Sequence, residues 1–280
     1  MIRFIISLGV WLLATPALAV ELIGTEALAA RLGEVVLVDA ESPQDYARAH
    51  LPGAVNLHFL DLEDEEENAK TGRPIFPQLA AKKIGDLGIG NDTALVVYDS
   101  GNGRAASALW HVLRFIGHEK VAILDGGFRK WLTEGRPLTQ QVPQPKAATY
   151  KPRPNAAWAL TTEQLAAGGP LVVDARSIAE YSGKEDGGAR RAGHIPGAIS
   201  FPWDRLAGEL LTFKDEAAMR AALEEAGITP EREIVTYCNG GLGRSTFLYA
   251  ALERLGYDKV RVYPGSWNEW AADPARPIER

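Results

Sequence analysis

The chain contains almost no cysteine: Cys238 is the only one among its 280 residues. A single thiol cannot form a disulfide within the chain, and it excludes a zinc site of the zinc-finger type. Basic residues are not in excess either, with 30 Lys and Arg against 36 Asp and Glu. This balance argues against a nucleic-acid-binding protein that holds phosphates, but it allows an anionic small substrate, because local charge need not follow net charge.

Long hydrophobic runs are absent except near the N-terminus, where residues 4–14 are apolar apart from Ser7 and Gly9. The run follows Arg3, and Ala17-Leu18-Ala19 places small residues where a signal peptidase reads them. We expect residues 1–19 to be a signal peptide, cleaved after Ala19, that exports the protein to the periplasm or out of the cell. A retained membrane anchor is the alternative, but a span needs about 20 apolar residues. No stable membrane span is expected after cleavage.

The sequence after the N-terminal run repeats itself. Three segments of the first half return in the second half: Val38-Asp39-Ala40 as Val173-Asp174-Ala175, His50-Leu51-Pro52-Gly53-Ala54 as His194-Ile195-Pro196-Gly197-Ala198, and Gly126 to Trp131 as Gly265 to Trp270. From Asp99 onward the paired positions lie 139 residues apart, so Asp99 corresponds to Cys238. A repeat of this length indicates a duplicated domain rather than a solenoid unit.

The segment between the two copies, residues 136–154, is rich in proline and has the composition of a linker. We therefore expect a first domain at residues 20–135, a linker at 136–159 and a second domain at 160–280. The second copy also carries an insertion, residues 182–191, before its histidine motif.

Both copies alternate short apolar runs with helical patterns. The runs at residues 35–38, 94–98, 171–173 and 234–237 are rich in β-branched residues, which is typical of parallel strands buried on both faces. Helical periodicity follows at residues 107–115 and 217–226. This alternation predicts an α/β fold in which each domain has a mostly parallel sheet flanked by helices.

The loop after the last of these strands carries the candidate chemistry. Between Cys238 and a predicted helix that starts near Arg244 stand Asn239, Gly240, Gly241, Leu242 and Gly243. Glycines allow the backbone to turn its amides inward, and inward amides at a helix N-terminus bind anions. The same field stabilises a thiolate, the nucleophilic form of cysteine. We predict that Cys238 is a catalytic nucleophile and that the loop binds substrate; a structural cysteine in a glycine-rich turn is the alternative.

Taken together, these motifs resemble the rhodanese-like sulfurtransferases in their two-domain form, the thiosulfate/3-mercaptopyruvate sulfurtransferase family. The resemblance covers essentially all of the chain after residue 19, and it rests on Asp174-Ala175-Arg176, the segment 193–198, the Cys238 loop and the segment 265–270. It implies two tandem rhodanese-like domains, the C-terminal one catalytic and the N-terminal one non-catalytic. Asp99 fits this assignment, because a carboxylate cannot carry a persulfide.

The resemblance also implies a double displacement. A sulfane sulfur passes from thiosulfate or 3-mercaptopyruvate to Cys238, which holds it as a persulfide, and then to a thiophilic acceptor such as cyanide or a thiol. A thiol protein that acts as reductant is a further candidate partner. The family needs no metal and no organic cofactor. Asn239 and Gly240 look more like the usual mercaptopyruvate form of the loop than the thiosulfate form but match neither, so the choice of donor stays open.

We expect the insertion at residues 182–191 to supply the positively charged side chains that bind an anionic donor. Relatives place an arginine just before the histidine motif, which implies substrate-binding roles for Arg191 and Arg190. A solvated basic turn is the alternative for these two residues.

Two other functions remain open at this point. Cys238 and Arg244, followed by Ser245, have the Cys-x5-Arg spacing of cysteine-dependent phosphatases, in which the arginine grips phosphate with two hydrogen bonds. In such an enzyme Arg244 would point into the loop, whereas in a sulfurtransferase the loop amides carry the anion. The third function is a non-enzymatic sulfane-sulfur carrier that uses the same Cys238.

Several motif residues are predicted to be structural rather than catalytic. His50 and His194 occupy the same turn in both copies although the first copy lacks the nucleophile. Trp267 and Trp270 are predicted to lie in the core. Asp174 and Arg176 are expected to support the loop through a salt bridge or to act as fold determinants.

Overall fold

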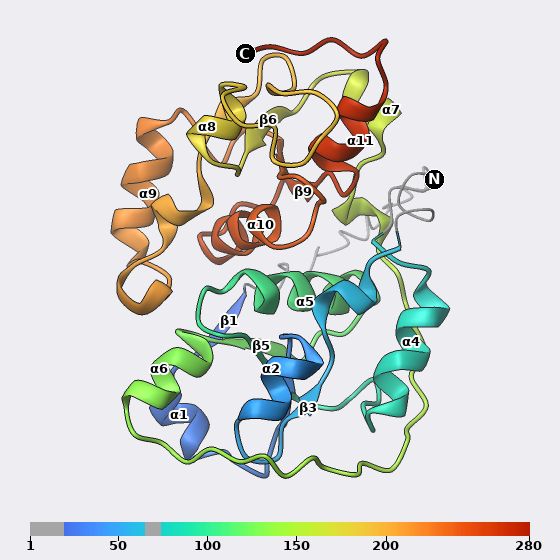
Figure 1. Ribbon diagram of the computed structural model, residues 1–280, viewed down its shortest axis with the longest axis vertical. Helices are drawn as coiled ribbons and strands as arrows, with labels where there is room; N and C mark the ends of the chain where they lie inside the picture. The colour runs from blue at the N-terminus through green and yellow to red at the C-terminus, as the bar shows by residue number, and fades with distance from the viewer. Residues whose placement is uncertain (1–19, 65–73) are drawn as a thin grey trace, which may run out of the picture.

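The computed structural model describes residues 20–64 and 74–280, which form two α/β domains joined by an extended linker (Figure 1). Within each of the two sheets, every pair of neighbouring strands in this part of the chain is parallel. The predicted α/β class with two mostly parallel sheets is therefore confirmed. The predicted signal peptide at residues 1–19 lies outside the described residues.

The first domain contains a sheet of five strands in the order β1-β5-β4-β2-β3. These strands are β1 (Glu21–Ile23), β2 (Val36–Asp39), β3 (Val55–Asn56), β4 (Leu95–Tyr98) and β5 (Val121–Leu124). The helices are α1 (Thr25–Ala29), α2 (Pro43–Arg48), α4 (Pro77–Asp86), α5 (Arg104–Phe115) and α6 (Gly127–Thr133), with a 3-10 turn at Phe59–Leu62.

The second domain contains a sheet of four strands in the order β7-β6-β8-β9. These strands are β6 (Leu171–Asp174), β7 (Ile199–Ser200), β8 (Ile234–Tyr237) and β9 (Val260–Val262). The helices are α7 (Thr162–Ala166), α8 (Ile178–Tyr181), α9 (Glu216–Glu225), α10 (Arg244–Arg254) and α11 (Ser266–Ala272). Three 3-10 turns lie at Ala156–Trp158, Trp203–Leu206 and Glu209–Leu211.

The two domains use the same local design at their centre. β4 and β8 are interior strands whose four residues are all buried, as expected for short apolar runs covered on both faces. Each strand leads through a glycine-rich loop into a long helix, α5 or α10. These two helices lie side by side where the domains meet, so both loops open toward the boundary between the copies (Figure 1).

Apolar side chains join the two domains in one continuous core. Phe247 of the second domain packs against the first-domain loop, where a Cβ atom at Gly103 would lie 2.6 Å from its ring. Trp110 on α5 lies 6.0 Å from Tyr249 on α10 and 6.3 Å from Trp158 in the linker region. Burial of each such aromatic side chain stabilises the folded chain by roughly 1.5–3 kcal/mol. The core therefore fixes the position of one domain on the other.

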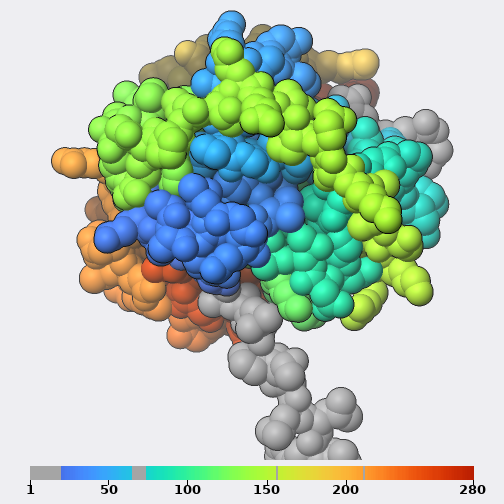
Figure 2. All heavy atoms as spheres, turned by 90° about the horizontal axis from the view of Figure 1, so that it is seen from below, coloured from blue at the N-terminus to red at the C-terminus, as the bar shows by residue number. Residues whose placement is uncertain are grey.

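The linker is bound to the first domain along its length, and Figure 2 shows it as a yellow-green band across that face. The amide of Ala148 donates to the Gly85 carbonyl at 2.9 Å, and the amide of Arg153 donates to the Ile116 carbonyl at 2.8 Å. A Cβ atom at Gly85 would lie 2.6 Å from the Ala148 oxygen, so this close approach requires glycine. The linker is thus held as an extended strap on the first domain.

A buried ion pair lies under the strand that leads to the candidate nucleophile. Arg176 and Asp174 are both fully buried, and the Arg176 guanidinium lies 2.6 Å from the Asp174 carboxylate. The same arginine donates to the Gly193 carbonyl at 2.8 Å, and the Tyr237 hydroxyl donates to Asp174 at 2.5 Å. These contacts tie the ends of β6 and β8 together, so the salt bridge is present, and its support of the loop stays a prediction.

Candidate active site

Cys238 stands directly after β8, at the carboxyl end of an interior parallel strand, which is where open α/β sheets place their ligands. Its backbone is held on both sides, because its amide donates to the Ser266 hydroxyl at 3.1 Å and its carbonyl accepts from the Trp267 amide at 3.0 Å. The sulfur lies 3.4 Å from the Ser245 hydroxyl and 3.6 Å from the Leu242 carbonyl. The thiol is thus fixed in one place, and only 2% of Cys238 is exposed to solvent.

The loop after Cys238 has a shape that only glycine permits at Gly241. Its φ is +84°, and a Cβ atom there would lie 2.0 Å from the Pro264 carbonyl oxygen. In the described part of the chain, the amides of Asn239, Gly240, Leu242 and Arg244 donate to no acceptor. Unpaired amide donors at the N-terminus of α10 form a ready site for negative charge.

The equivalent loop of the first domain shows what this arrangement holds. The Asp99 carboxylate stands in the position of Cys238 and accepts hydrogen bonds from the amides of Gly101 at 2.8 Å, Gly103 at 3.1 Å and Ala106 at 3.1 Å. Burial raises the pKa of Asp99, and the three amide hydrogen bonds act against that rise. The first loop therefore binds its own side-chain carboxylate. In the second loop the amides of Gly240 and Leu242, which correspond to those of Gly101 and Gly103, have no acceptor among the described residues.

Arg244, the first residue of α10, is held by an acidic partner. Its two terminal nitrogens donate to both carboxylate oxygens of Glu180, at 2.6 and 3.0 Å. Burial would raise the pKa of Glu180, but the bonds from Arg244 and from the Ser177 amide lower it to about 2. Asn239 also donates to Glu180 at 2.9 Å. The charge of Arg244 is therefore neutralised by a carboxylate that stays ionised at every ordinary pH.

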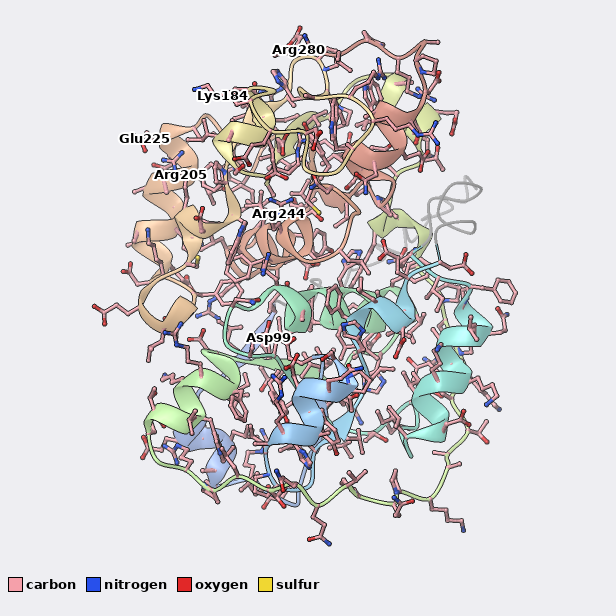
Figure 3. All side chains as sticks on the ribbon, in the orientation of Figure 1. Asp99, Lys184, Arg205, Glu225, Arg244 and Arg280 are labelled. Carbon is pink, nitrogen blue, oxygen red and sulfur yellow. The ribbon has the colours of Figure 1, made fainter. Side chains whose placement is uncertain are left out.

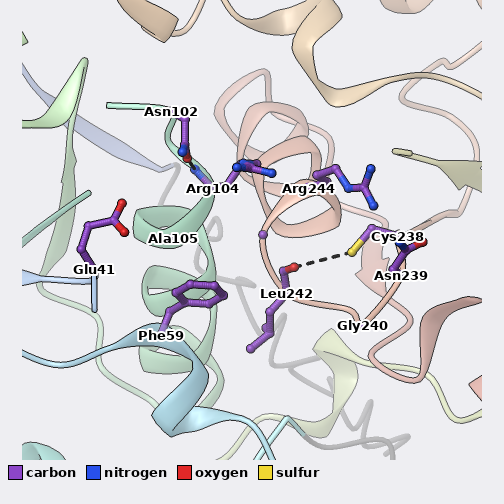
Figure 4. Close-up of a pocket in the computed structure, with 11 residues that line it drawn as sticks. Glu41, Phe59, Asn102, Arg104, Ala105, Cys238, Asn239, Gly240, Leu242 and Arg244 are labelled. Carbon is purple, nitrogen blue, oxygen red and sulfur yellow. Dashed lines mark hydrogen bonds between the residues drawn. The ribbon is translucent and has the colours of Figure 1, made fainter. Parts of the chain in front are cut away.

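A pocket of about 220 Å³ opens above Cys238 between the two domains (Figure 4). The second domain contributes Cys238, Asn239, Gly240, Leu242, Gly243 and Arg244, and the first contributes Glu41, Phe59, Asn102, Arg104 and Ala105. The loop residues predicted to bind substrate line this pocket, except for Gly241, which turns against Pro264 instead. Figure 3 shows Asp99 and Arg244 on the two sides of the boundary between the domains.

The model of the rhodanese-like domain matches this chain twice, at residues 25–134 and 158–273. The chain belongs to the rhodanese-like family. The prediction of a two-domain rhodanese-like chain is therefore confirmed.

Several curated rhodanese-like relatives match almost all of the chain. The thiosulfate sulfurtransferases of Pseudomonas aeruginosa and Azotobacter vinelandii are each 36% identical over 265 residues, which is 90% of this chain and 94% of each relative. The sulfur carrier protein TtuD of Thermus thermophilus is 35% identical and covers 84% of this chain and 87% of its own length. Among solved structures, the anaerobic ergothioneine biosynthesis enzyme of Chlorobium limicola has a TM-score of 0.83 at 23% identity, covering 92% of this chain and 70% of that one. That likeness shows the shared fold.

The structure places Arg191, predicted to bind the donor, away from the rhodanese pocket. Its guanidinium donates to backbone carbonyls at the end of α11, those of Trp270, Ala271, Asp273 and Arg276, at 2.6–3.2 Å. An arginine suits this place because the carboxyl end of a helix carries partial negative charge. The predicted substrate-binding role of Arg191 is thus corrected to that of a helix cap.

Arg190 is also absent from the residues that line the pocket, and its side chain is exposed. Its substrate-binding role therefore stays a prediction, and the lining of this pocket gives it no support. The sequence could not separate these cases, because a basic pair beside a glycine motif looks the same whether it faces a pocket, a helix end or solvent.

The histidines of the rhodanese motifs have the predicted structural role. His50 stacks on Tyr46 with ring centroids 3.8 Å apart, and its Nδ1 lies 2.8 Å from the Tyr46 carbonyl. His194 stacks on Tyr181 at 3.6 Å and makes the equivalent 2.8 Å contact with the Tyr181 carbonyl. Each ring therefore fixes a turn after a short helix. Trp267 and Trp270 lie in the core, as predicted.

Sequence reasoning missed the first-domain side of the pocket. Arg104, Phe59 and Glu41 lie in segments without a recognisable motif, and the first domain lacks the nucleophile. Their role depends on how α5 packs against α10, which no local pattern predicts. The duplication was the one available signal. It places the loop after Asp99 in the first domain at the position that the Cys238 loop has in the second.

Proposed function

We propose that this chain is a thiosulfate sulfurtransferase that carries the transferred sulfur as a persulfide on Cys238. The observation that carries the proposal is the relation of the two loops: three amides bind the Asp99 carboxylate, whereas the Gly240 and Leu242 amides of the Cys238 loop have no acceptor among the described residues. The names of the two relatives that are 36% identical support thiosulfate as the donor. 3-Mercaptopyruvate is the alternative donor.

In the first half-reaction the Cys238 thiolate attacks the outer, sulfane sulfur of thiosulfate. A bond forms between Cys238 Sγ and the sulfane sulfur. The sulfur–sulfur bond of thiosulfate breaks, and the electron pair of that bond leaves with sulfite. One thiolate and one dianion become one persulfide anion and one dianion, so charge is conserved. The amides at the N-terminus of α10 stabilise the negative charge that moves to the terminal sulfur.

In the second half-reaction an acceptor attacks the terminal sulfur of the persulfide. The bond between the two sulfur atoms breaks, and its electron pair returns to Cys238 as the thiolate. Cyanide would leave as thiocyanate, and a thiol would leave as a persulfide. A thiol protein is a further candidate acceptor, which would agree with the name of the relative called a sulfur carrier protein.

The phosphatase alternative is disfavoured by the partner of Arg244. A phosphatase arginine holds phosphate through two parallel hydrogen bonds, and in this chain Glu180 already accepts two from Arg244. Phosphate would have to displace a carboxylate that is itself held by Ser177 and Asn239. We therefore expect aryl phosphate hydrolysis close to background.

An assay of the purified protein with three substrates tests this proposal. We expect Cys238-dependent thiocyanate formation from thiosulfate and cyanide, because the thiol and the free amides line one pocket. Turnover of 3-mercaptopyruvate serves as the comparison, and p-nitrophenyl phosphate serves as the phosphatase control. Phosphate release that requires Cys238 and is lost in Arg244→Ala would overturn the proposal.

We also propose that the protein is exported through cleavage of residues 1–19. The support is the apolar run followed by Ala17-Leu18-Ala19. Among the residues that the structure describes, no helix has the length and apolar character needed to cross a membrane. N-terminal sequencing of the protein from the cell exterior or periplasm is expected to begin at Val20, and a chain that begins at Met1 would contradict the proposal.

A further inference from the structure

The pocket above Cys238 contains two arginines with different electrostatic states. Arg244 belongs to the catalytic domain and is neutralised by Glu180 through two hydrogen bonds. Arg104 belongs to the first domain, and within residues 20–64 and 74–280 its guanidinium has no carboxylate partner. The Arg104 side chain is exposed, and its guanidinium lies over the Trp203 ring, 5.5 Å from the centroid. The uncompensated positive charge of the pocket therefore comes from the domain that lacks the nucleophile.

The backbone of Arg104 is fixed against the catalytic loop. Its amide donates to Asn102 Oδ1 at 2.9 Å, and its carbonyl accepts from the Ser107 hydroxyl at 3.0 Å. The same Ser107 oxygen lies 3.5 Å from the Gly243 carbonyl and 3.5 Å from the Thr246 hydroxyl. Arg104 thus begins α5 at the point where α5 touches the start of α10.

Glu41 is the acidic residue among the described residues that line the pocket. Glu41 accepts a hydrogen bond from the Ser100 amide at 2.8 Å, which holds its carboxylate on the first domain. Figure 4 draws Glu41 at the end of the pocket opposite Cys238, whereas Arg104 and Arg244 lie along the edge that leads to the sulfur. Arg104 is therefore a lining cation of this pocket that has no carboxylate partner among the described residues.

We propose that Arg104 binds the sulfonate end of the sulfur donor across the domain boundary and so favours dianionic over monoanionic donors. This inference rests on the proposed sulfur transfer at Cys238. When the sulfur–sulfur bond of thiosulfate breaks, its electron pair increases the negative charge on the departing sulfite oxygens. A guanidinium presents parallel donors that match such oxygens. The non-catalytic domain thereby supplies the donor-binding cation that the catalytic domain lacks.

Single-turnover loading of Cys238 measures this role directly. The protein is mixed with increasing thiosulfate, and the gain of one sulfur atom on Cys238 is followed by mass spectrometry. For Arg104→Ala we expect the half-saturating thiosulfate concentration to rise about 10- to 100-fold, the usual loss for a charge-assisted contact. Arg104→Lys should recover part of this loss, because it keeps the charge without the paired donors. Arg31→Ala, an exposed arginine of the same domain paired with Glu34, is the matched control and should behave as wild type.

Two further measurements separate donor binding from a structural effect. Methanethiosulfonate is a monoanionic donor, and Arg104→Ala should raise its half-saturating concentration by a smaller factor than that of thiosulfate. Discharge of the preloaded persulfide by the neutral thiol dithiothreitol should proceed at the wild-type rate. Equal weakening of loading by thiosulfate, loading by methanethiosulfonate and discharge by dithiothreitol would show that Arg104 acts on the fold of the loop. That result would overturn the proposal.

Failure of this inference is distinguishable from failure of the proposed function. If wild type loads Cys238 from thiosulfate and Arg104→Ala loads it with the same concentration dependence, the role of Arg104 is refuted and sulfur transfer stands. If wild type gains no sulfur at any thiosulfate concentration, the proposed function itself is refuted.

Discussion

Cys238→Ser is expected to reduce thiocyanate formation to the level of the blank while the protein stays folded. A hydroxyl oxygen is a weak nucleophile here and forms no persulfide, so both half-reactions lose their covalent intermediate. The serine side chain is slightly smaller than cysteine, and its hydroxyl meets two oxygen partners, the Leu242 carbonyl and the Ser245 hydroxyl. The free energy of unfolding should therefore change by no more than about 1 kcal/mol.

Three measurements check this prediction together. Steady-state turnover of thiosulfate and cyanide gives the activity, mass spectrometry gives the sulfur content of residue 238, and urea unfolding gives the stability. Wild type should gain one sulfur atom and the serine variant none. Thiocyanate production by a folded serine variant would show that another group accepts the sulfur, and the Cys238 mechanism would then be wrong.

Arg176→Met is expected to cause the largest loss of stability, about 3–5 kcal/mol, because it leaves the buried Asp174 carboxylate without its partner. The pair is inaccessible to solvent, so water cannot replace the lost interaction. The variant also removes the donor to the Gly193 carbonyl, which anchors the histidine turn of the second domain. The catalytic loop follows β8, whose Tyr237 hydroxyl binds the same carboxylate, so activity should fall along with stability.

A double variant is the matched control for this experiment. Asp174→Asn combined with Arg176→Met removes both charges, so the loss in free energy of unfolding should be clearly smaller than for Arg176→Met alone. Urea unfolding of the wild type, both single variants and the double variant gives the coupling energy. A double variant that is as unstable as Arg176→Met would contradict the buried-charge explanation and assign the loss to packing.

The sequence allowed the strand–cysteine–loop–helix unit to be predicted because its signals are local. The apolar runs at residues 94–98 and 234–237 correspond to β4 and β8. The glycines of the loop indicated positive backbone angles, which Gly241 and Gly243 adopt. The edge strands β1 and β9 have only three residues each, too few for a distinct pattern of their own. Their positions follow from pairing: β1 pairs with β5, which is distant in sequence, and β9 pairs with β8, the strand before it.

The cations of the site could not be predicted in the same way. Arg191 stands beside the expected motif, yet the end of α11, about eighty residues later, takes up its guanidinium. Arg104 stands in a domain that lacks the nucleophile, yet the packing of α5 on α10 brings it to the pocket. In both cases the decisive contact joins segments that are far apart in the sequence, and hydrophobic periodicity carries no information about which polar residue faces such a contact.

The continuous core between the domains has a consequence for folding. Phe247 and Tyr249 of the second domain are buried partly against residues of the linker and of the first domain, such as Trp110. A catalytic half expressed alone would expose this apolar face to water, and exposed faces of that kind promote association. We therefore expect the two copies to unfold together in one cooperative transition. A destabilising substitution deep in the first domain will then appear as loss of the Cys238 site, although no atom of that site has been changed.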